Sequence, residues 1–250
     1  MKTAWNETRV ADEGTRLARL DAGEIVAWTL DAFGPEVVIA SSFSKEDVAL
    51  IDLASQSGRP FRLVALDTGR LHEETYWVAE QVRQRYDLMI EWHMPHGNDV
   101  EAMIRETGMY AFRRSLKDRK RCCEIRKVRP LRRALASAPA WMTGLRRSQG
   151  VTREDLPPLE WDRVFGGIAK ANPLFAWSDE ALEAYVAERQ LPSNALYDQG
   201  YLSIGCAPCT RPVAEGQHPR SGRWWWEDPG NAECGLHPAS HLKQGQAERN

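Results

Sequence analysis

Short apolar runs alternate with longer amphipathic stretches through the first 150 residues, and this alternation limits the folds open to the chain. The runs at 36–40, 61–66, 88–94 and 140–144 are rich in β-branched or aromatic residues and predict buried strands. The stretches at 14–33, 46–56, 72–86 and 120–137 have helical patterning, and a helix over 178–190 would begin after Ser178 as its N-cap. Strands that alternate with helices indicate an α/β fold with a parallel sheet.

The last forty residues have a different composition. Residues 210–250 contain four prolines, several glycines and the run Trp224-Trp225-Trp226, which disfavours long helices and strands. We therefore expect an α/β body over 1–209 and a flexible C-terminal arm over 210–250 that carries Cys234. The tryptophans are expected to pack on the body.

The charge balance and the cysteine count restrict the function classes. Lys and Arg total 33 and Asp and Glu total 35, so no global positive field favours nucleic acid or a membrane surface. No apolar run reaches membrane-span length, and the first residues lack the apolar stretch of a secretory signal. Five cysteines without a signal predict a reducing compartment, the cytoplasm, where clustered thiols indicate metal or redox chemistry.

Four of the cysteines form two tight pairs. Cys122 and Cys123 are adjacent, and Cys206 and Cys209 form a C-x-x-C motif. Adjacent residues point their side chains apart, which suits a single zinc ion poorly and the larger 4Fe–4S cluster, held by four thiolates, better. We therefore predict four cluster ligands and one free reactive thiol, Cys234.

The segment around the first pair is strongly basic. From 113 to 133 the chain has eleven Lys or Arg residues against two acidic ones. A solvated helix face is the ordinary interpretation of such a run. The cysteines in its middle favour instead a surface that faces an anion or the negatively charged cluster.

Two predicted strands end in polar loops on the same edge of the sheet. The first leads into a Ser loop that contains Ser41, Ser42 and Ser44, and the second leads into Asp67-Thr68-Gly69. A strand–loop–helix junction directs backbone N–H groups to the crevice beyond this edge, where anions and nucleotides bind. Each loop alone fits an ordinary turn or helix cap about equally well, but two on one edge predict a nucleotide site.

Several cations and one thiol complete the candidate site. Arg146 follows the fourth predicted strand and Lys127 follows the cysteine pair, and both suit phosphate or sulfate oxygens. Near the C-terminus, Cys234 is accompanied by basic residues that would lower its thiol pKa: His218, Arg220, Arg223 and His237.

Taken together, these motifs resemble the assimilatory adenylyl-sulfate reductases of the sulfonucleotide (APS/PAPS) reductase family. The resemblance is carried by an ordered set of segments between about residue 35 and residue 238: the Leu66–Arg70 loop, Arg121–Lys127, Gly144–Gln149, Gly205–Arg211, Gly222–Trp226 and Glu233–His237. It implies an adenine nucleotide α-hydrolase-like (Rossmann-like) domain in which the Ser loop and the Asp67 loop hold the adenylate.

The resemblance also implies the chemistry. Cys122, Cys123, Cys206 and Cys209 would bind a 4Fe–4S cluster, and the phosphosulfate would be held by a set of cations: Lys127, Arg220, Arg223 and His237. Cys234 would attack the sulfur of adenosine 5′-phosphosulfate and release AMP. Thioredoxin, or a glutaredoxin-like reductant, would then release sulfite from the S-sulfocysteine, in the assimilation of sulfate toward cysteine.

Two alternatives stay open at this point. Relatives that use the 3′-phosphorylated nucleotide typically lack the four cluster cysteines, which favours the unphosphorylated substrate here, although some cluster-bearing members accept both. A remote alternative is a zinc-stabilised nucleic-acid-binding module that uses the same four cysteines and the basic run. The sequence leaves open whether the chain forms a homo-oligomer.

Overall fold

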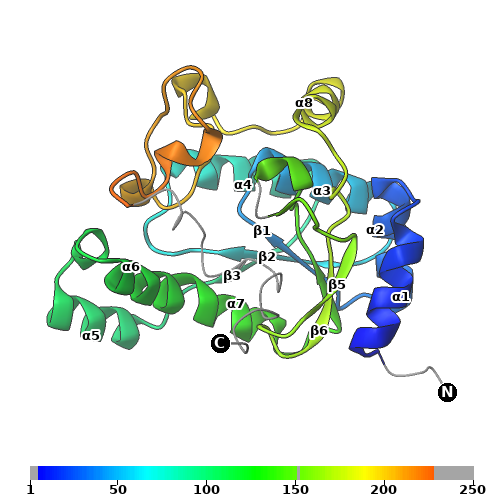
Figure 1. Ribbon diagram of the computed structural model, residues 1–250, viewed down its shortest axis with the longest axis horizontal. Helices are drawn as coiled ribbons and strands as arrows, with labels where there is room; N and C mark the ends of the chain where they lie inside the picture. Colours follow the sequence, from blue (N-terminus) through cyan, green and yellow to red (C-terminus); the bar gives the residue numbers. More distant parts are fainter. Residues whose placement is uncertain (1–4, 151–152, 228–250) are drawn as a thin grey trace, which may run out of the picture.

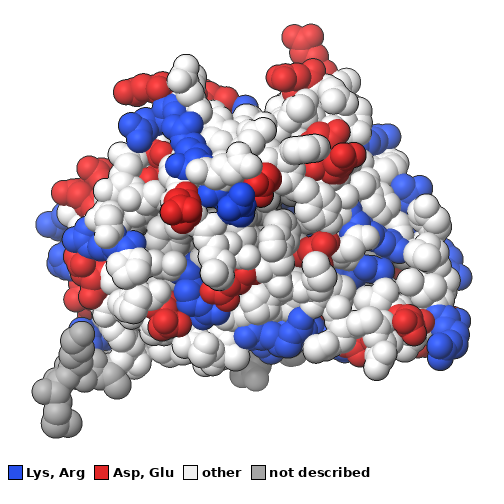
Figure 2. Space-filling view, turned by 180° about the vertical axis from the view of Figure 1, so that it is seen from behind, with Lys and Arg blue, Asp and Glu red and all other residues white. Residues whose placement is uncertain are grey.

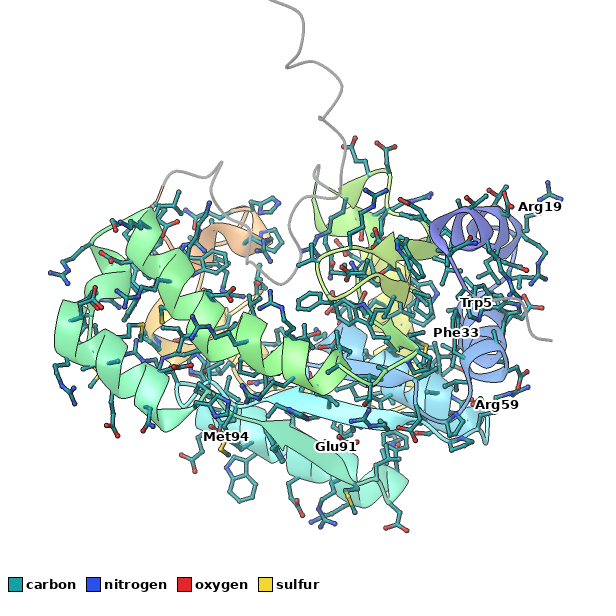
Figure 3. The ribbon with its side chains drawn as sticks, turned by 90° about the horizontal axis from the view of Figure 1, so that it is seen from below. Trp5, Arg19, Phe33, Arg59, Glu91 and Met94 are labelled. Atoms are coloured by element: carbon teal, nitrogen blue, oxygen red, sulfur yellow. The ribbon has the colours of Figure 1, made fainter. Side chains whose placement is uncertain are left out.

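A computed structural model describes residues 5–150 and 153–227, and it begins with two helices where the sequence pattern predicted one. Helices α1 (Glu7–Leu17) and α2 (Ala22–Phe33) are separated by a turn. The break occurs because Asp21 caps α2: its Oδ1 accepts from the Glu24 backbone N–H at 2.8 Å, and Glu24 accepts from the Asp21 N–H at 2.9 Å. Trp5 packs on Phe33 with ring centroids 4.3 Å apart, which holds the start of the chain against α2 (Figure 3).

One six-stranded sheet forms the centre of the molecule. Its strands are β1 (Val38–Ser41), β2 (Arg62–Leu66), β3 (Ile90–His93), β4 (Ala140–Met142), β5 (Leu159–Asp162) and β6 (Ile168–Ala171). They lie in the order β3-β2-β1-β4-β6-β5, and only β5 runs antiparallel to its neighbour. The predicted parallel α/β sheet is thus confirmed, and the connection order reverses between β1 and β4.

Strands β5 and β6 lie between the predicted strand at 140–144 and the predicted helix at 178–190, a polar stretch in which no strand was predicted. Their alternation is hidden by charged residues, because Glu160 and Lys170 face each other across the pair. The Lys170 ammonium lies 2.8 Å from the Glu160 carboxylate, and Lys170 is buried. Because the two charges are paired, the Lys170 side chain can be buried in the sheet.

Helices cover both faces of the sheet (Figure 1). Successive residues of β1 and β2 point to opposite faces of the sheet. Ile39 and Leu63 belong to the core under α2, α3 (Lys45–Gln56) and α4 (Glu73–Tyr86). Val38 and Val64 belong to the core under α7 (Arg129–Leu135). This two-residue alternation is the geometry of a strand with both faces buried. Before the basic segment come helix α5 (Gly97–Thr107) and the short 3₁₀ turn η1 (Ala111–Arg113). Helix α5 was not predicted from the sequence.

The basic segment forms a continuous but irregular helical unit. Helix α6 (Leu116–Cys123) passes into a π-helical turn, η2 (Glu124–Val128), and then into α7. Pro130 lies in the first turn of α7, where its missing N–H is tolerated. The predicted helix over 120–137 is therefore confirmed in outline.

The remaining described elements are α8 (Asp179–Glu188) and four short 3₁₀ turns. Ser178 caps α8 as predicted, since its hydroxyl accepts from the Ala181 N–H at 3.1 Å. The turns are η3 (Arg147–Gln149), η5 (Tyr197–Gln199), η6 (Ala207–Cys209) and η7 (Pro219–Gly222).

Residues 210–227, the described part of the predicted arm, pack on the body. Trp224 is buried, as expected for the tryptophan run, and the buried Arg119 guanidinium pairs with Glu227 at 2.7 Å. The division at residue 210 and the mobility of the arm remain predictions.

Charges of both signs are mixed on the face shown in Figure 2, without a broad area of one sign. Among the helices in the described ranges, 5–150 and 153–227, none has the length and apolar character needed to cross a bilayer.

Candidate functional site

A cavity of about 600 Å³ lies beyond the carboxyl ends of β1 and β4. Its floor includes Ala40 and Ser41 from β1 and Trp141 and Thr143 at β4. Its walls come from α8 and from residues 202–205 and 218–223; in Figure 1, α8 and the orange C-terminal segment stand apart on the same side of the sheet. A crevice at the point where strand order reverses is where open α/β sheets bind their ligands, and the volume suits a small molecule.

Most of the described substrate-binding candidates line this cavity. They are Ser41, Ser42, Ser44, Thr68, Lys127, Arg146, Arg220 and Arg223. Asp67 and Gly69 are outside its lining, although they belong to the same loop as Thr68. Cys234 and His237 lie outside the described residues, so their roles remain predictions.

The hydrogen-bond donors of the Ser loop already have acceptors within the protein, which the sequence did not indicate. The backbone N–H of Ser42 donates to Asp47 Oδ2 at 2.6 Å, and the Ser42 hydroxyl donates to the same oxygen at 2.7 Å. The Phe43 N–H donates to Ser41 Oγ at 3.0 Å. These N–H groups, expected to face an anionic ligand, are bonded to the protein itself.

Phe43 holds the loop in a demanding conformation. Its φ of 57° is in the left-handed region, which an aromatic residue rarely adopts. The ring is buried and lies 5.9 Å from the Trp92 ring. Such a conformation costs about 1–3 kcal/mol and is typical of functional sites, where the surroundings hold it in place.

Two groups in the cavity were not singled out from the sequence. Asp47 is buried, and burial raises the pKa of its carboxyl to about 6 despite the hydrogen bonds from Ser42. Tyr197 approaches from η5, its hydroxyl accepts from the Lys45 N–H at 3.4 Å, and burial raises its pKa. Asp47 could have been noticed as the acidic residue three positions after the Ser44 cap; Tyr197 has no local signal.

The loop after β2 connects the cavity to the C-x-x-C segment. Asp67 accepts from the Gly69 N–H at 2.7 Å and from the Tyr76 hydroxyl at 2.9 Å. The Thr68 hydroxyl lies 3.3 Å from Cys206 Sγ, and the Arg126 guanidinium donates to the Thr68 carbonyl at 2.6 Å. A change in the cysteine segment would therefore reach the floor of the cavity.

Arg146 is tied to carboxylates within the protein. Its guanidinium lies 2.9 Å from Glu46 and 2.7 Å from Asp179, and it is almost fully buried. These pairs connect the loop after β4 to α3 and to the start of α8. Contact of Arg146 with a substrate stays a prediction, and its described contacts give it a structural role.

Three lining cations form what we call the basic wall of the cavity: Lys127 and Arg223 both lower the thiol pKa of Cys209, and Arg220 and Arg223 both lie over the Trp224 ring. Lys127 comes from the π-helical turn η2, a type of irregularity common at functional sites. Arg220 comes from η7, and Arg223 follows it with its guanidinium held between the Ile204 carbonyl at 3.3 Å and the Trp224 ring at 4.8 Å. Guanidinium and ammonium groups on one wall suit phosphate or sulfonate oxygens.

The cysteine pairs are contributed by the end of α6 and by η6, and none of these four described cysteines is in a disulfide. Burial raises the pKa of the Cys209 thiol to about 12, with further increases from Cys206 and Cys122. Burial also raises the pKa of Cys122, against the influence of Arg70 and Arg126. Three of the thiols therefore belong to one neighbourhood that also contains cations.

This donor set is chemically suited to a cluster ligated by four thiolates, and nearby cations would stabilise its negative charge. Across residues 5–150 and 153–227, however, no three or more His, Cys, Asp or Glu side chains are arranged to hold one metal ion. The metal prediction for Cys122, Cys123, Cys206 and Cys209 thus rests on residue type and on their shared neighbourhood.

The sheet order, the position of the cavity and its basic wall define an α/β protein of the adenine nucleotide α-hydrolase-like class. A solved phosphoadenylyl-sulfate (PAPS) reductase from Candida auris, in complex with phosphate, superposes with a TM-score of 0.71 at 25% identity, covering 85% of this chain and 100% of the other. An FMN adenylyltransferase from Candida glabrata superposes at 0.54 with 15% identity over 90% of this chain and 76% of its own, a likeness of fold alone.

Sequence comparison gives the particular family. The model of the phosphoadenosine phosphosulfate reductase domain matches residues 36–212, and the chain belongs to this family. An adenosine 5′-phosphosulfate reductase of Burkholderia cepacia is 42% identical over 95% of this chain and 93% of its own. A probable 5′-adenylylsulfate reductase 1 of Oryza sativa is 44% identical over 90% of this chain, but this chain spans only 48% of that protein's length.

Proposed function

We propose that this chain reduces adenosine 5′-phosphosulfate to sulfite and AMP. The observation that carries the proposal is a nucleotide-sized cavity at the strand-order reversal with one basic wall of Lys127, Arg220 and Arg223. Relatives named adenosine 5′-phosphosulfate reductase, 42% to 44% identical over most of this chain, support the choice of substrate. They also favour an enzyme over a zinc-stabilised nucleic-acid-binding module.

In the proposed reaction the Cys234 thiolate attacks the sulfate sulfur. A sulfur–sulfur bond forms, the bond from sulfur to the bridging phosphate oxygen breaks, and AMP leaves with that electron pair. Lys127, Arg220 and Arg223, with His237, would neutralise the sulfonate and the departing phosphate. The thiolate is the reactive form, and nearby cations favour it by lowering the thiol pKa.

Release of sulfite needs two electrons, which we assign to a dithiol protein such as thioredoxin. One of its thiolates attacks Cys234 Sγ and displaces sulfite, and its second thiol resolves the mixed disulfide and restores Cys234. The cysteines of the described ranges form no disulfide, which is consistent with a reducing compartment, for which we propose the cytoplasm.

A 4Fe–4S cluster would be held by Cys122, Cys123, Cys206 and Cys209. When bound, it would supply a charged, rigid group beside the cavity. The protein's own contribution in this region is positional: Thr68 and Arg126 connect the cysteine segments to the cavity floor. Visible absorption and iron and sulfide content of an anaerobic preparation would test the cluster, and a colourless zinc-containing protein would contradict it.

The activity is tested with reduced thioredoxin and adenosine 5′-phosphosulfate. We expect equal amounts of sulfite and AMP, and a sulfonate adduct on Cys234 when the reductant is left out. The Cys234→Ser variant should form no adduct; an adduct in that variant would show that another residue is the nucleophile.

The second candidate substrate is the 3′-phosphorylated nucleotide, supported by the Candida auris PAPS reductase among the similar structures. Comparing kcat/KM for the two nucleotides decides between them, and a higher value for the 3′-phosphorylated one would overturn our assignment.

A further inference from the structure

Four cations at the start of the basic segment have no opposite charge beside them in the fold. Further along the segment, Lys127 lines the cavity, and Arg119 and Arg121 are paired with carboxylates. The four at the start are exposed, and within residues 5–150 and 153–227 they form no ion pair: Arg113, Arg114, Lys117 and Lys120.

Folding does not account for these charges. Lys117 is in the first turn of α6, where the helix dipole disfavours a cation by about 0.3–1 kcal/mol. The needs of this turn are met by other residues, since the Ser115 hydroxyl caps it and Asp118 supplies an acidic side chain. Exposed cations that destabilise the helix they lie on indicate a surface that meets an anionic partner.

An exposed aromatic cluster adjoins these cations. The Tyr110 side chain is 63% exposed and Met109 is 52% exposed. The Arg113 guanidinium lies 5.2 Å from the ring centroids of both Trp225 and Trp226. These contacts join η1 to the C-terminal segment, which lies on the same side of the molecule as α6 (Figure 1).

We call this region the Tyr110 surface. It comprises the aromatic cluster and the exposed cations around it: Met109, Tyr110, Arg113, Arg114, Lys117, Lys120, Arg211 and Trp225.

The composition of the Tyr110 surface is that of a protein-binding site. Trp, Tyr and Arg dominate the hot spots of protein interfaces, and Met is enriched in their cores. Nucleic-acid bases stack on open ring faces. Trp225 is instead covered by guanidinium groups, because Arg113 and Arg211 each lie 5.2 Å from its centroid. The arrangement therefore favours a protein as the partner.

The Tyr110 surface also adjoins the root of the segment that carries Cys234. Trp225 and Trp226 directly precede Glu227, whose carboxylate lies 2.7 Å from the buried Arg119 guanidinium. Cys234 follows Glu227 by seven residues, which span at most about 25 Å. A standard interface of about 800 Å² per partner is about 30 Å across. A protein whose thiols reach Cys234 can therefore contact this surface.

We propose that the Tyr110 surface docks the dithiol protein that releases sulfite from Cys234, and that this partner presents an acidic contact face. The inference rests on the proposed function and deepens it by assigning the docking site of the reductant. The covalent step is unchanged: a partner thiolate attacks Cys234 Sγ, sulfite leaves, and the second partner thiol resolves the mixed disulfide.

Two other occupants match the surface less well. A second copy of the chain would place the same cations opposite one another, which is unfavourable. The chain's own residues 228–250 carry three acidic and two basic side chains, so they have little net charge to offer.

The main test compares reduced thioredoxin with dithiothreitol as the reductant. Both attack the same sulfur, but only the protein needs a docking surface. In Lys117→Glu, kcat/KM for thioredoxin should fall about fivefold or more at low salt, and turnover with dithiothreitol should not change. The loss should shrink at about 0.5 M salt, where screening acts within about 4 Å. A glutamate suits the first turn of a helix, so this variant is expected to fold.

A second variant tests the aromatic part of the Tyr110 surface. Tyr110→Ala should lower kcat/KM for thioredoxin by about tenfold with little dependence on salt. Arg19→Glu is the control for charge, because Arg19 is exposed at the end of the molecule opposite α5 and α6 (Figure 3). Met89→Ala is the apolar control, since Met89 is 83% exposed outside the Tyr110 surface. Both controls should stay within about twofold of wild type.

Each outcome has a distinct meaning. Unchanged kcat/KM for thioredoxin in Lys117→Glu and Tyr110→Ala, or an equal loss in the controls, overturns the inference. Equal losses with both reductants also overturn it, because the surface would then serve the chain's own site. Formation of the sulfonate on Cys234 without reductant should keep its wild-type rate in every variant. If wild type forms no adduct, the proposed function fails; if the adduct forms and thioredoxin does not release sulfite from it, the docking inference alone fails.

Discussion

Gly205 is the position at which one added methyl group should disable the basic wall. The Arg223 guanidinium occupies the space beside Gly205: a Cβ built there would be 2.2 Å from Arg223 Nη2 and 2.5 Å from Cζ. Ordinary contacts between such atoms are about 3.5 Å, so in Gly205→Ala the guanidinium must move by more than about 1 Å. Its present contacts, the Ser203 hydroxyl at 3.4 Å and the Ile204 carbonyl at 3.3 Å, would be lost.

The size of the effect follows from what Arg223 is proposed to do. A hydrogen bond to a charged group contributes about 1.5–3 kcal/mol, so displacement of Arg223 from the phosphosulfate should lower kcat/KM by about 10- to 100-fold. The backbone of Gly205 is not in the left-handed region, so alanine imposes no strain of its own. We therefore expect the melting temperature to stay close to that of the wild type although activity is lost.

The assay is kcat/KM for adenosine 5′-phosphosulfate, with the Kd of AMP measured in parallel. Gly97→Ala is the control, because Gly97 has an ordinary φ and no atom within 4 Å of the new Cβ; its activity should stay within about twofold of wild type. Gly205→Ala should have little further effect in an Arg223→Ala background. Wild-type activity in Gly205→Ala, or an equal additional loss in the Arg223→Ala background, would refute the reasoning. Iron content, measured in each variant, separates this effect from damage to the proposed cluster.

Further predictions concern stability and the covalent intermediate. Burial raises the pKa of the Asp52 carboxyl, but hydrogen bonds, led by that from Tyr185 at 2.6 Å, outweigh it, so the pKa is lowered overall. Its contribution to stability is therefore present above the unfolded value near 4 and lost as the pH falls below it. Asp52→Ala should reduce the free energy of unfolding in urea by about 2–4 kcal/mol at pH 7, and a smaller loss at pH 3 is the required signature. Glu227→Gln removes the carboxylate that lies 2.7 Å from the buried Arg119 guanidinium. This variant should lower the free energy of unfolding by about 3 kcal/mol and make residues 210–227 more sensitive to protease. Unchanged proteolysis would show that this ion pair does not hold the segment on the body. Cys234→Ser should abolish sulfite formation with little change in AMP affinity; a large loss of affinity would mean that the thiol also binds the nucleotide.

The sequence pattern located an element correctly where residues close together in the chain determine its structure. Apolar β-branched runs located β1 and β2 to within two residues, because strands buried on both faces need continuous hydrophobic residues. The Ser178 cap located α8. By contrast, the Asp21 capping box was present in the sequence and overlooked, which merged α1 with α2.

Strands were missed where their charged residues are neutralised by a partner distant in the sequence. Glu160 and Lys170 disguised β5 and β6 as a polar stretch, because the ion pair that permits their burial forms only across the sheet. The Ser loop shows the same principle in the site. Its serines line the cavity, but its hydrogen bonds are directed to Asp47, whose Oδ1 lies 2.8 Å from where a Cβ on Gly144, in the loop after β4, would be.

The chain by itself therefore determined the α/β class and the family, since these follow from periodicity and from an ordered set of motifs. Only the tertiary structure decided which of the candidate site residues line the cavity and which are paired within the protein. It placed Lys127, Arg220 and Arg223 along one wall of the cavity and paired Arg146 with Glu46 and Asp179. The physical reason is that charge and hydrogen-bond direction depend on partners brought together by folding, which spacing along a chain does not specify.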